Sequence, residues 1–137
     1  MKYKKLTIYT DGGARNNPGP AGIGCVLYNE NKKIIKEISE YIGETTNNQA
    51  EYKACLRAME EAKKLGAEEL AFFLDSELVV KQLNREYKVK NKELAPLFMK
   101  IYNLSQQFKK VTFSHVRREF NKEADALVNE AIDNYIS

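Results

Sequence analysis

The sequence predicts an α/β fold with a five-stranded mixed sheet flanked by helices. Three observations predict it: three successive strand-like segments near the amino terminus, a change to helical periodicity at residue 48, and a short continuous apolar run after that helix. Strands joined by a tight turn pair antiparallel, whereas strands joined through a helix usually pair in parallel. We therefore expect the first three strands to form an antiparallel unit, with parallel strands beside it.

The first three strands are predicted over residues 6–10, 21–29 and 33–42. The first reads Leu-Thr-Ile-Tyr-Thr, the alternation of a half-buried strand. The stretch that follows it holds five of the seven glycines and two of the three prolines, which indicates a turn-rich loop. Residues 29–32, Asn-Glu-Asn-Lys, favour a hairpin turn before the third strand.

The second half of the chain alternates helices with two further strands. Over residues 48–65, alanines recur every four residues on one stripe and a glycine follows, which predicts a helix with a buried face. Residues 70–74 are continuously apolar, as in a strand buried on both faces. The remaining elements are predicted as helices over 76–83, 93–108 and 121–135 and a strand over 110–116.

Length and composition favour one globular domain over residues 1–137. The chain is 43% hydrophobic and 30% charged, a balance that excludes a disordered protein. It contains neither an apolar run of about 18 residues nor a signal-peptide pattern, so we expect a cytoplasmic protein without a membrane partner. Cys25 and Cys55 lie within apolar patterns and the chain has one histidine, which favours reduced buried thiols and excludes a zinc site.

Positive charge is concentrated in residues 81–122. That segment holds 11 Lys or Arg against three Asp or Glu, although the net charge of the whole chain is only +3. Such a segment fits a polyanionic partner, but solvated helix faces have the same composition. Both interpretations remain open from the charge alone.

Three acidic residues stand at the ends or starts of predicted elements. Asp11 follows the first strand, Asp75 follows the fourth, and Glu51 lies in the first turn of the first long helix. Parallel neighbouring strands would bring Asp11 and Asp75 to one sheet edge, where open α/β sheets bind ligands. Each residue also has a structural alternative: a turn at Asp11, a helix N-cap at Asp75, and a capping box from Asn48 to Glu51.

A fourth carboxylate, Asp125, shares the apolar stripe of the last helix with Val128 and Ile132. Glu51 lies in the same way on the alanine stripe of its own helix. Ionised carboxylates on core-facing stripes are costly unless they are neutralised, and several in one site repel each other strongly. Because oxygen is the only ligand type present, the four carboxylates indicate Mg²⁺ or Mn²⁺. Two such ions often act together in phosphodiester chemistry.

Four segments, in order along nearly the whole chain, resemble type 1 ribonuclease H. They are residues 9–24 (YTDGGARNNPGPAGIG), 45–51 (TTNNQAE), 75–76 (DS) and 121–125 (NKEAD). The resemblance implies a ribonuclease H-like fold and an endoribonuclease that cleaves the RNA strand of RNA–DNA hybrids. It also implies products with 5′-phosphate and 3′-hydroxyl ends.

The resemblance implies two Mg²⁺ ions, for which Mn²⁺ can substitute, held by the four carboxylates. The implied metal ligands and catalytic residues are Asp11, Glu51, Asp75 and Asp125, with Asp11 bridging both ions. Glycine amides and asparagine amides suit contacts with a duplex backbone and a shallow minor groove. The implied substrate contacts are Gly12, Gly13, Asn17, Thr46, Asn47 and Asn48; Asn48 could cap the helix instead.

The sequence departs from many bacterial members before the final motif. They carry a histidine in a glycine-containing loop there, whereas residues 116–121 contain neither, and His115 lies too early and is expected on the strand. This region resembles a shorter subgroup that includes archaeal-type members. In that subgroup Arg118 is placed to approach the scissile phosphate or to assist product release; the alternatives are a plain phosphate contact or a surface charge.

The long Trp-rich basic protrusion of some members is also missing, since the chain has no Trp. Lys88, Lys90 and Lys92 are candidates to take over part of its role. The expected partner is an RNA–DNA hybrid and the expected state is a monomer. Alternative functions are a same-fold nuclease that prefers duplex RNA or hybrid–DNA junctions, and a non-catalytic nucleic-acid binding module. A small-molecule phosphate enzyme is disfavoured because the glycine-rich stretch lacks a P-loop motif.

Overall fold

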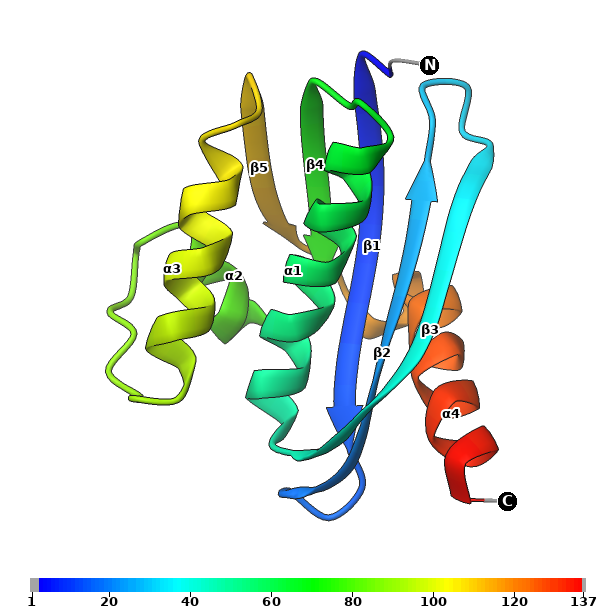
Figure 1. Cartoon of the computed structure of the whole chain (residues 1–137), viewed down its shortest axis with the longest axis vertical. Coiled ribbons are helices and arrows are strands. Elements are labelled where there is room, and N and C mark those ends of the chain that lie inside the picture. Colours follow the sequence, from blue (N-terminus) through cyan, green and yellow to red (C-terminus); the bar gives the residue numbers. More distant parts are fainter. Residues whose placement is uncertain (1–2, 137) are drawn as a thin grey trace.

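The computed structural model describes residues 3–136, which form a mixed five-stranded sheet with helices on both faces (Figure 1). The elements follow the predicted order, with one 3₁₀ turn in addition. They are β1 (Lys5–Ala14), β2 (Gly19–Tyr28), β3 (Ile34–Thr45), α1 (Asn47–Lys64), β4 (Glu69–Leu74), α2 (Glu77–Leu83), α3 (Leu94–Ser105), β5 (Lys110–His115), η1 (Arg118–Phe120) and α4 (Lys122–Ile136).

The sheet has the strand order β3-β2-β1-β4-β5. β1 pairs antiparallel with β2 and β2 with β3, whereas β4 pairs in parallel with both β1 and β5. This arrangement confirms the predicted antiparallel unit and the predicted parallel neighbours. β1 is therefore central, and it borders both halves of the sheet.

Helices α1, α2 and α3 cover one face of the sheet, and α4 covers the other (Figure 1). The alanine stripe of α1 is fully buried, as predicted, because small side chains let the helix pack closely on the strands. Large apolar residues of β1 and β4, such as Ile8 and Phe72, complete the core beneath it. Among the described residues, no helix is both long and apolar enough to cross a membrane.

The glycine-rich stretch is the largest departure from the predicted fold. The expected strand ended at residue 10, but β1 continues to Ala14 and pairs with β2 as far as Ala14 opposite Ala21. Only residues 15–18 remain as a connection. The prediction of a long turn-rich loop was wrong because most of these glycines serve close packing within the sheet and against helices.

Smaller departures concern the ends of elements. β3 extends three residues beyond its predicted end, to Thr45. α3 ends at Ser105 instead of residue 108 because the chain turns there to enter β5, and the Lys109 amide donates to the carbonyl of Glu68. None of these changes alters the order of the elements.

Candidate active site

Three carboxylates meet at the carboxyl ends of the parallel strands. Asp11 lies on β1, Asp75 directly follows β4, and Glu51 lies in the second turn of α1. One oxygen of each lies within 4.8 Å of the others. The last β1–β4 pair joins Tyr9 to Phe73, so Asp11 and Asp75 each stand two residues beyond it. Side chains two residues apart on a strand share a face, which is why the two aspartates emerge at the same level.

Gly12 brings α1 against β1 next to this cluster. A Cβ at Gly12 would lie 2.3 Å from the carbonyl carbon of Ala50 and 2.6 Å from the amide nitrogen of Glu51. No other residue could occupy this position without moving the helix. The missing side chain therefore sets the distance between the strand that carries Asp11 and the helix that carries Glu51.

Gly24 allows α4 to pack closely on the other face of the sheet, as Gly12 does for α1. It lies directly opposite Asp11 in the β1–β2 register, and a Cβ there would lie 2.1 Å from the carbonyl oxygen of Ala124. Asp125 is the next residue of α4, and its carboxyl group hydrogen-bonds with that of Asp11. The fourth predicted carboxylate thus joins the cluster through Asp11.

Neither Glu51 nor Asp75 is used as a helix cap. The side chain of Thr46 caps α1 by accepting from the amide of Gln49, so the predicted capping box from Asn48 to Glu51 was wrong. The side chain of Ser76 caps α2 by accepting from the amide of Val79, so Asp75 is not the cap either. Both carboxylates remain available for ligands.

Burial and mutual repulsion raise the pKa of two of these carboxyl groups. The pKa of Asp11 is raised to about 8, first by burial and then by the charge of Asp75, the hydrogen bond with Asp125 and the charge of Glu51. The pKa of Glu51 is raised to about 8 by burial and by Asp75, against the opposing effects of Ser76 and Arg118. A site of this kind binds either protons or a cation at neutral pH.

The chemistry of the donor set fits Mg²⁺ or Mn²⁺. The cluster offers carboxylate oxygens alone, which are the ligands that these hard cations prefer. The surrounding cleft has a volume of about 250 Å³ and is open to solvent. Its lining adds four polar side chains: Arg15, Asn47, Arg118 and Asn129. The cleft can therefore hold cations together with an anionic ligand.

A family model described as reverse transcriptase-like matches residues 9–131. The bifunctional protein Rv2228c of Mycobacterium tuberculosis is 41% identical over 130 residues, which cover 94% of this chain but 36% of that protein. Ribonuclease HI of Halobacterium salinarum is 40% identical over 129 residues, 94% of this chain and 65% of the relative. The chain thus spans between about a third and two thirds of these relatives.

Among solved structures, LC11-RNase H1, isolated from compost, is 48% identical with a TM-score of 0.92 and covers 98% of this chain and 99% of its own. The chain belongs to the ribonuclease H type 1 family. A second structure of LC11-RNase H1, in complex with an RNA/DNA hybrid, is 47% identical with a TM-score of 0.92 over 96% of this chain and 99% of that one.

In this ribonuclease H chain, Arg118 begins the 3₁₀ turn η1 and lines the cleft with an exposed side chain. Its positive charge lowers the pKa of Glu51, so Arg118 interacts electrostatically with the carboxylate cluster. His115 is the last residue of β5 and pairs with Leu74, as expected for a strand residue. Arg118, rather than His115, is therefore the basic group that faces the carboxylates from this segment.

Two of the predicted substrate contacts, Asn17 and Asn47, use their side chains to hold backbone amides. The side-chain oxygen of Asn17 accepts from the amide of Asn47 at 2.9 Å, and the side-chain oxygen of Asn47 accepts from the amide of Ala14 at 2.7 Å. These bonds use the acceptor end of each side chain and leave the NH₂ ends as donors. The pair is thus better suited to phosphate oxygens than to groups that need an acceptor.

The other predicted substrate contacts differ in how exposed they are to ligands. Gly12 is buried beneath α1, so its packing role is clear, while Gly13 and Asn48 are half-buried. Thr46 is half-buried and its side chain caps α1. Contact of these residues with substrate remains a prediction.

One polar residue next to the carboxylate cluster was missed as a site residue. Asn121 is fully buried, and its NH₂ group donates to the carbonyl of Thr10 at 2.9 Å and to Oδ2 of Asp75 at 3.0 Å. The sequence holds one signal that could have found it. Asn121 continues the apolar stripe of α4, since it lies three residues before Ala124 and seven before Val128.

Proposed function

We propose that this chain is an endoribonuclease that cleaves the RNA strand of RNA–DNA hybrids. The observation that carries the proposal is the meeting of Asp11, Glu51 and Asp75 within 4.8 Å, with Asp125 hydrogen-bonded to Asp11. LC11-RNase H1, a relative with the same fold over almost the whole chain, has been solved in complex with an RNA/DNA hybrid. A non-catalytic binding module would not need four carboxylates whose mutual repulsion destabilises the metal-free fold.

Two Mg²⁺ ions, when bound, lower the pKa of an attacking water and stabilise the charge that develops on the phosphate and on the leaving 3′ oxygen. We propose that Asp11, which interacts with the other three carboxylates, would help to hold both ions. Asp125, on the α4 side, would hold one ion with Asp11, and Glu51 with Asp75 would hold the other. The proposed products carry 5′-phosphate and 3′-hydroxyl ends.

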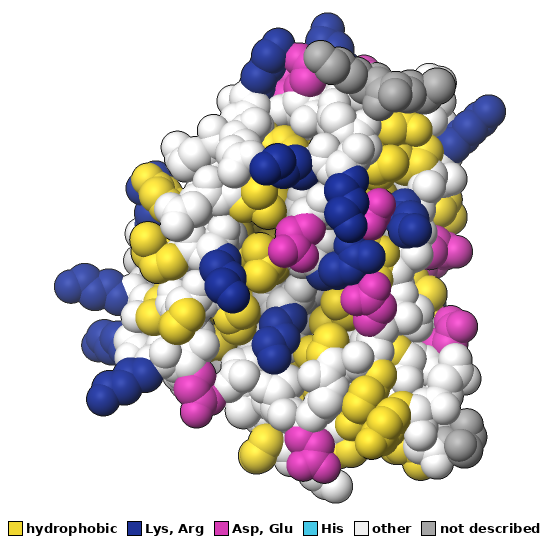
Figure 2. Space-filling model, in the orientation of Figure 1, with side chains coloured by type: hydrophobic (Ala, Val, Ile, Leu, Met, Phe, Trp, Pro, Cys, Tyr) yellow, Lys and Arg dark blue, Asp and Glu magenta, His cyan; other side chains and the backbone are white. Residues whose placement is uncertain are grey.

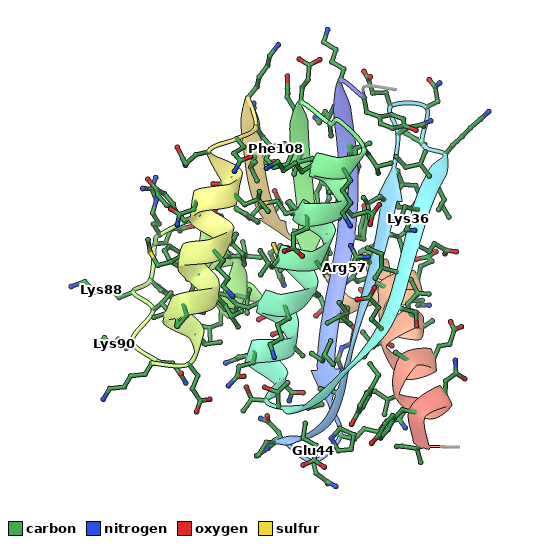
Figure 3. All side chains as sticks on the ribbon, viewed as in Figure 1. Lys36, Glu44, Arg57, Lys88, Lys90 and Phe108 are labelled. Carbon is green, nitrogen blue, oxygen red and sulfur yellow. The ribbon has the colours of Figure 1, made fainter. Side chains whose placement is uncertain are left out.

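The chain's own basic and amide groups would bind and orient the substrate. Arg118 lines the same cleft as the carboxylates, so its guanidinium can bind a phosphate that enters there. The NH₂ groups of Asn17 and Asn47 supply uncharged donors beside the same cleft. Lys88 and Lys90 project from the loop between α2 and α3, away from the body of the molecule (Figure 3). Their charge is suited to the phosphates of a bound duplex outside the cleft.

We also propose that residues 1–137 act as one catalytic domain and as a monomer, to be checked by sedimentation of the metal-loaded protein. The thiols of Cys25 and Cys55 are both buried and unpaired. They would remain reduced in the cytoplasm, which is the proposed location.

Cleavage of end-labelled substrates tests the proposed function. The wild-type protein is incubated with an RNA–DNA hybrid in Mg²⁺, in Mn²⁺ and in EDTA, and in parallel with duplex RNA, duplex DNA and a hybrid–DNA junction. We expect internal cuts in the RNA strand of the hybrid, only with a divalent cation, and 5′-phosphate ends on the fragments. Faster cleavage of duplex RNA or of the junction would instead support the same-fold alternatives. Tight binding without any cleavage would support the binding module.

A further inference from the structure

Asn121 connects three elements that carry the carboxylates. It directly precedes α4, and its backbone carbonyl accepts from the amide of Asp125 at 3.1 Å. Its side-chain NH₂ donates to the Thr10 carbonyl, on the residue before Asp11, and to the Asp75 carboxylate. One buried residue thus joins the backbone of β1 and the residue after β4 through its side chain, and the first turn of α4 through its backbone.

The amide of Asn121 continues the contact between β1 and β4 where their own pairing stops. The last backbone pair of these parallel strands joins Tyr9 to Phe73. Beyond it, Nδ2 of Asn121 stands between Thr10 and Asp75 and donates to both. The two strand ends are therefore held at a fixed separation by a side chain, which leaves room for the carboxylates above it.

The orientation of the Asn121 amide is determined by its surroundings. Both atoms that Nδ2 contacts, a carbonyl oxygen and a carboxylate oxygen, are acceptors. The reversed orientation would place Oδ1 against two acceptors, which is repulsive. Oδ1 is itself buried without a hydrogen-bond partner among the described residues. Burial of an oxygen without a partner lowers stability, so Oδ1 itself gives no reason for an asparagine at this position. The feature that a carbon isostere would lack is the pair of hydrogen bonds that Nδ2 donates.

We infer that Asn121 is a positioning residue that orients the carboxylate of Asp75 for cation binding. The inference rests on the proposed function, since Asp75 is a metal ligand only if the cluster binds metal. Asp75 is not fixed by helix capping, so without Asn121 its side chain would be free to rotate about χ1 and χ2. With Oδ2 held by Nδ2, the other oxygen remains for a cation shared with Asp11 and Glu51. Hydrogen bonds to metal-binding carboxylates orient them and strengthen binding.

Calorimetric titration with Mn²⁺ tests the inference on the wild-type protein, on Asn121→Leu and on Asn121→Ala. Leucine retains the volume and removes both donors, and alanine serves if leucine is not accommodated. We expect Mn²⁺ affinity to fall about 10-fold, while the melting temperature of metal-free Asn121→Leu falls by only a few degrees, because the Thr10 carbonyl loses its donor. The matched control is Asn84→Ala, which removes an asparagine donor to the Phe113 carbonyl outside the cluster and should leave Mn²⁺ affinity unchanged.

The outcomes separate this inference from the proposed function. If the wild-type protein binds no Mn²⁺, the proposed function fails. If the wild-type protein binds Mn²⁺ and the Asn121 variants bind it equally well, Asn121 has only a structural role and the inference is overturned. A measurement on the unmodified sequence covers the case in which neither variant folds. Titration of ¹⁵N-labelled protein with Mg²⁺ should shift the side-chain NH₂ resonances of Asn121 but not those of Asn84, and unshifted Asn121 resonances would also overturn the inference.

Discussion

The carboxylate cleft and the loop between α2 and α3 are built in opposite ways. The cleft lies at the ends of paired strands, and two glycines hold the helices against them at distances that no side chain would allow. The loop, residues 84–93, is exposed over most of its length and carries Lys88, Lys90 and Lys92. Figure 2 shows long basic side chains projecting into solvent at the edge of the molecule where Figure 3 places Lys88 and Lys90.

This difference indicates separate roles for the two regions, metal binding in the cleft and phosphate binding by the loop. Metal ligands must be held within a fraction of an ångström, which requires packed elements and register. Phosphate contacts outside the cleft act over several ångströms and tolerate flexible side chains. We therefore expect substitutions in the cleft to change the rate of the chemical step and substitutions in the loop to change binding and its salt dependence.

The largest expected effect is that of Asp11→Asn. It removes the carboxylate that interacts with the other three and that we propose as a metal ligand, so we expect the cleavage rate to fall at least about 1,000-fold. Hybrid binding should be retained or strengthened in low metal, because a negative charge that faces phosphate is lost. Gel-resolved cleavage and a binding titration measure the two effects. Glu130→Gln, at an exposed position of α4, is the control, and retained turnover in Asp11→Asn would contradict the assignment of the cleft.

Two adjacent glycines provide a test of the packing that brings Asp11 to Glu51. Gly12→Ala would place a methyl group 2.3 Å from the α1 backbone, whereas Gly13→Ala would meet its nearest neighbour, Cγ1 of Val128, at 3.7 Å. We expect Gly12→Ala to lower the free energy of unfolding by about 2–4 kcal/mol and to reduce cleavage by about 100-fold. Gly13→Ala should retain nearly wild-type stability. Urea unfolding and cleavage rates compare them, and equal behaviour of the two variants would refute the packing argument.

Substitution of Arg118 should have an intermediate effect. If its guanidinium binds the phosphate in the cleft, Arg118→Ala should reduce kcat by about 10-fold with a smaller change in KM. Arg117→Ala is the matched control, since Arg117 is also exposed and its charge contacts Glu119 instead of the cleft. Steady-state kinetics on a hybrid at saturating Mg²⁺ distinguish the two. Equal losses in both variants would indicate a general charge effect.

The loop lysines should affect binding alone. Lys88→Ala combined with Lys90→Ala should weaken hybrid binding about 3–10-fold and reduce the slope of log K against log salt by about 1–2. The rate of the chemical step at saturating substrate should stay unchanged. The control is Lys63→Ala combined with Lys64→Ala, in the last turn of α1, at the end of the helix far from Glu51. An unchanged salt slope in the loop variant would exclude the loop from the substrate interface.

The smallest expected effect concerns the pH dependence of stability in EDTA. The pKa values of Asp11 and Glu51 are about 8 in the fold, against ordinary values near 4, so the folded state binds more protons than the unfolded state between these values. Their contribution to stability is therefore present below about pH 4 and is lost as the pH rises through about 8. Asp11→Asn should remove part of this loss and raise the melting temperature at pH 8 by about 5 °C. Scanning calorimetry from pH 5 to 9 measures it, and a parallel pH dependence in both proteins would contradict it.

How far the sequence predicts this molecule depends on whether a signal is periodic or local. Alternation in the first strand and the alanine stripe of α1 indicated which side of each element faces the core. The convergence of Asp11, Asp75 and Glu51 could therefore be predicted. Local signals were ambiguous, because a glycine next to an aspartate is typical both of a turn and of a strand beneath a helix. Gly12 belongs to the second class, which only its packing partner in α1 reveals.

Asn121 was missed for a related reason. The sequence placed Asn121 at the start of the helix predicted over residues 121–135, but the partners of its side chain cannot be inferred from its neighbours in sequence. Thr10 lies 111 residues away and Asp75 lies 46 residues away. Contacts of this range become visible only when the strand order is known.

That long-range contact also makes the site a late product of folding. Residues 11, 51 and 75 can approach each other once β1 has paired with β4 and α1 has packed on them. Asp125 and Asn121 join them only when α4 packs on the other face of the sheet (Figure 1). During synthesis, a chain that lacks α4 would carry three mutually repelling carboxylates without the amide that separates the strand ends. Nuclease activity of this chain would therefore report the completed fold, and partly made chains would be harmless to the RNA around them.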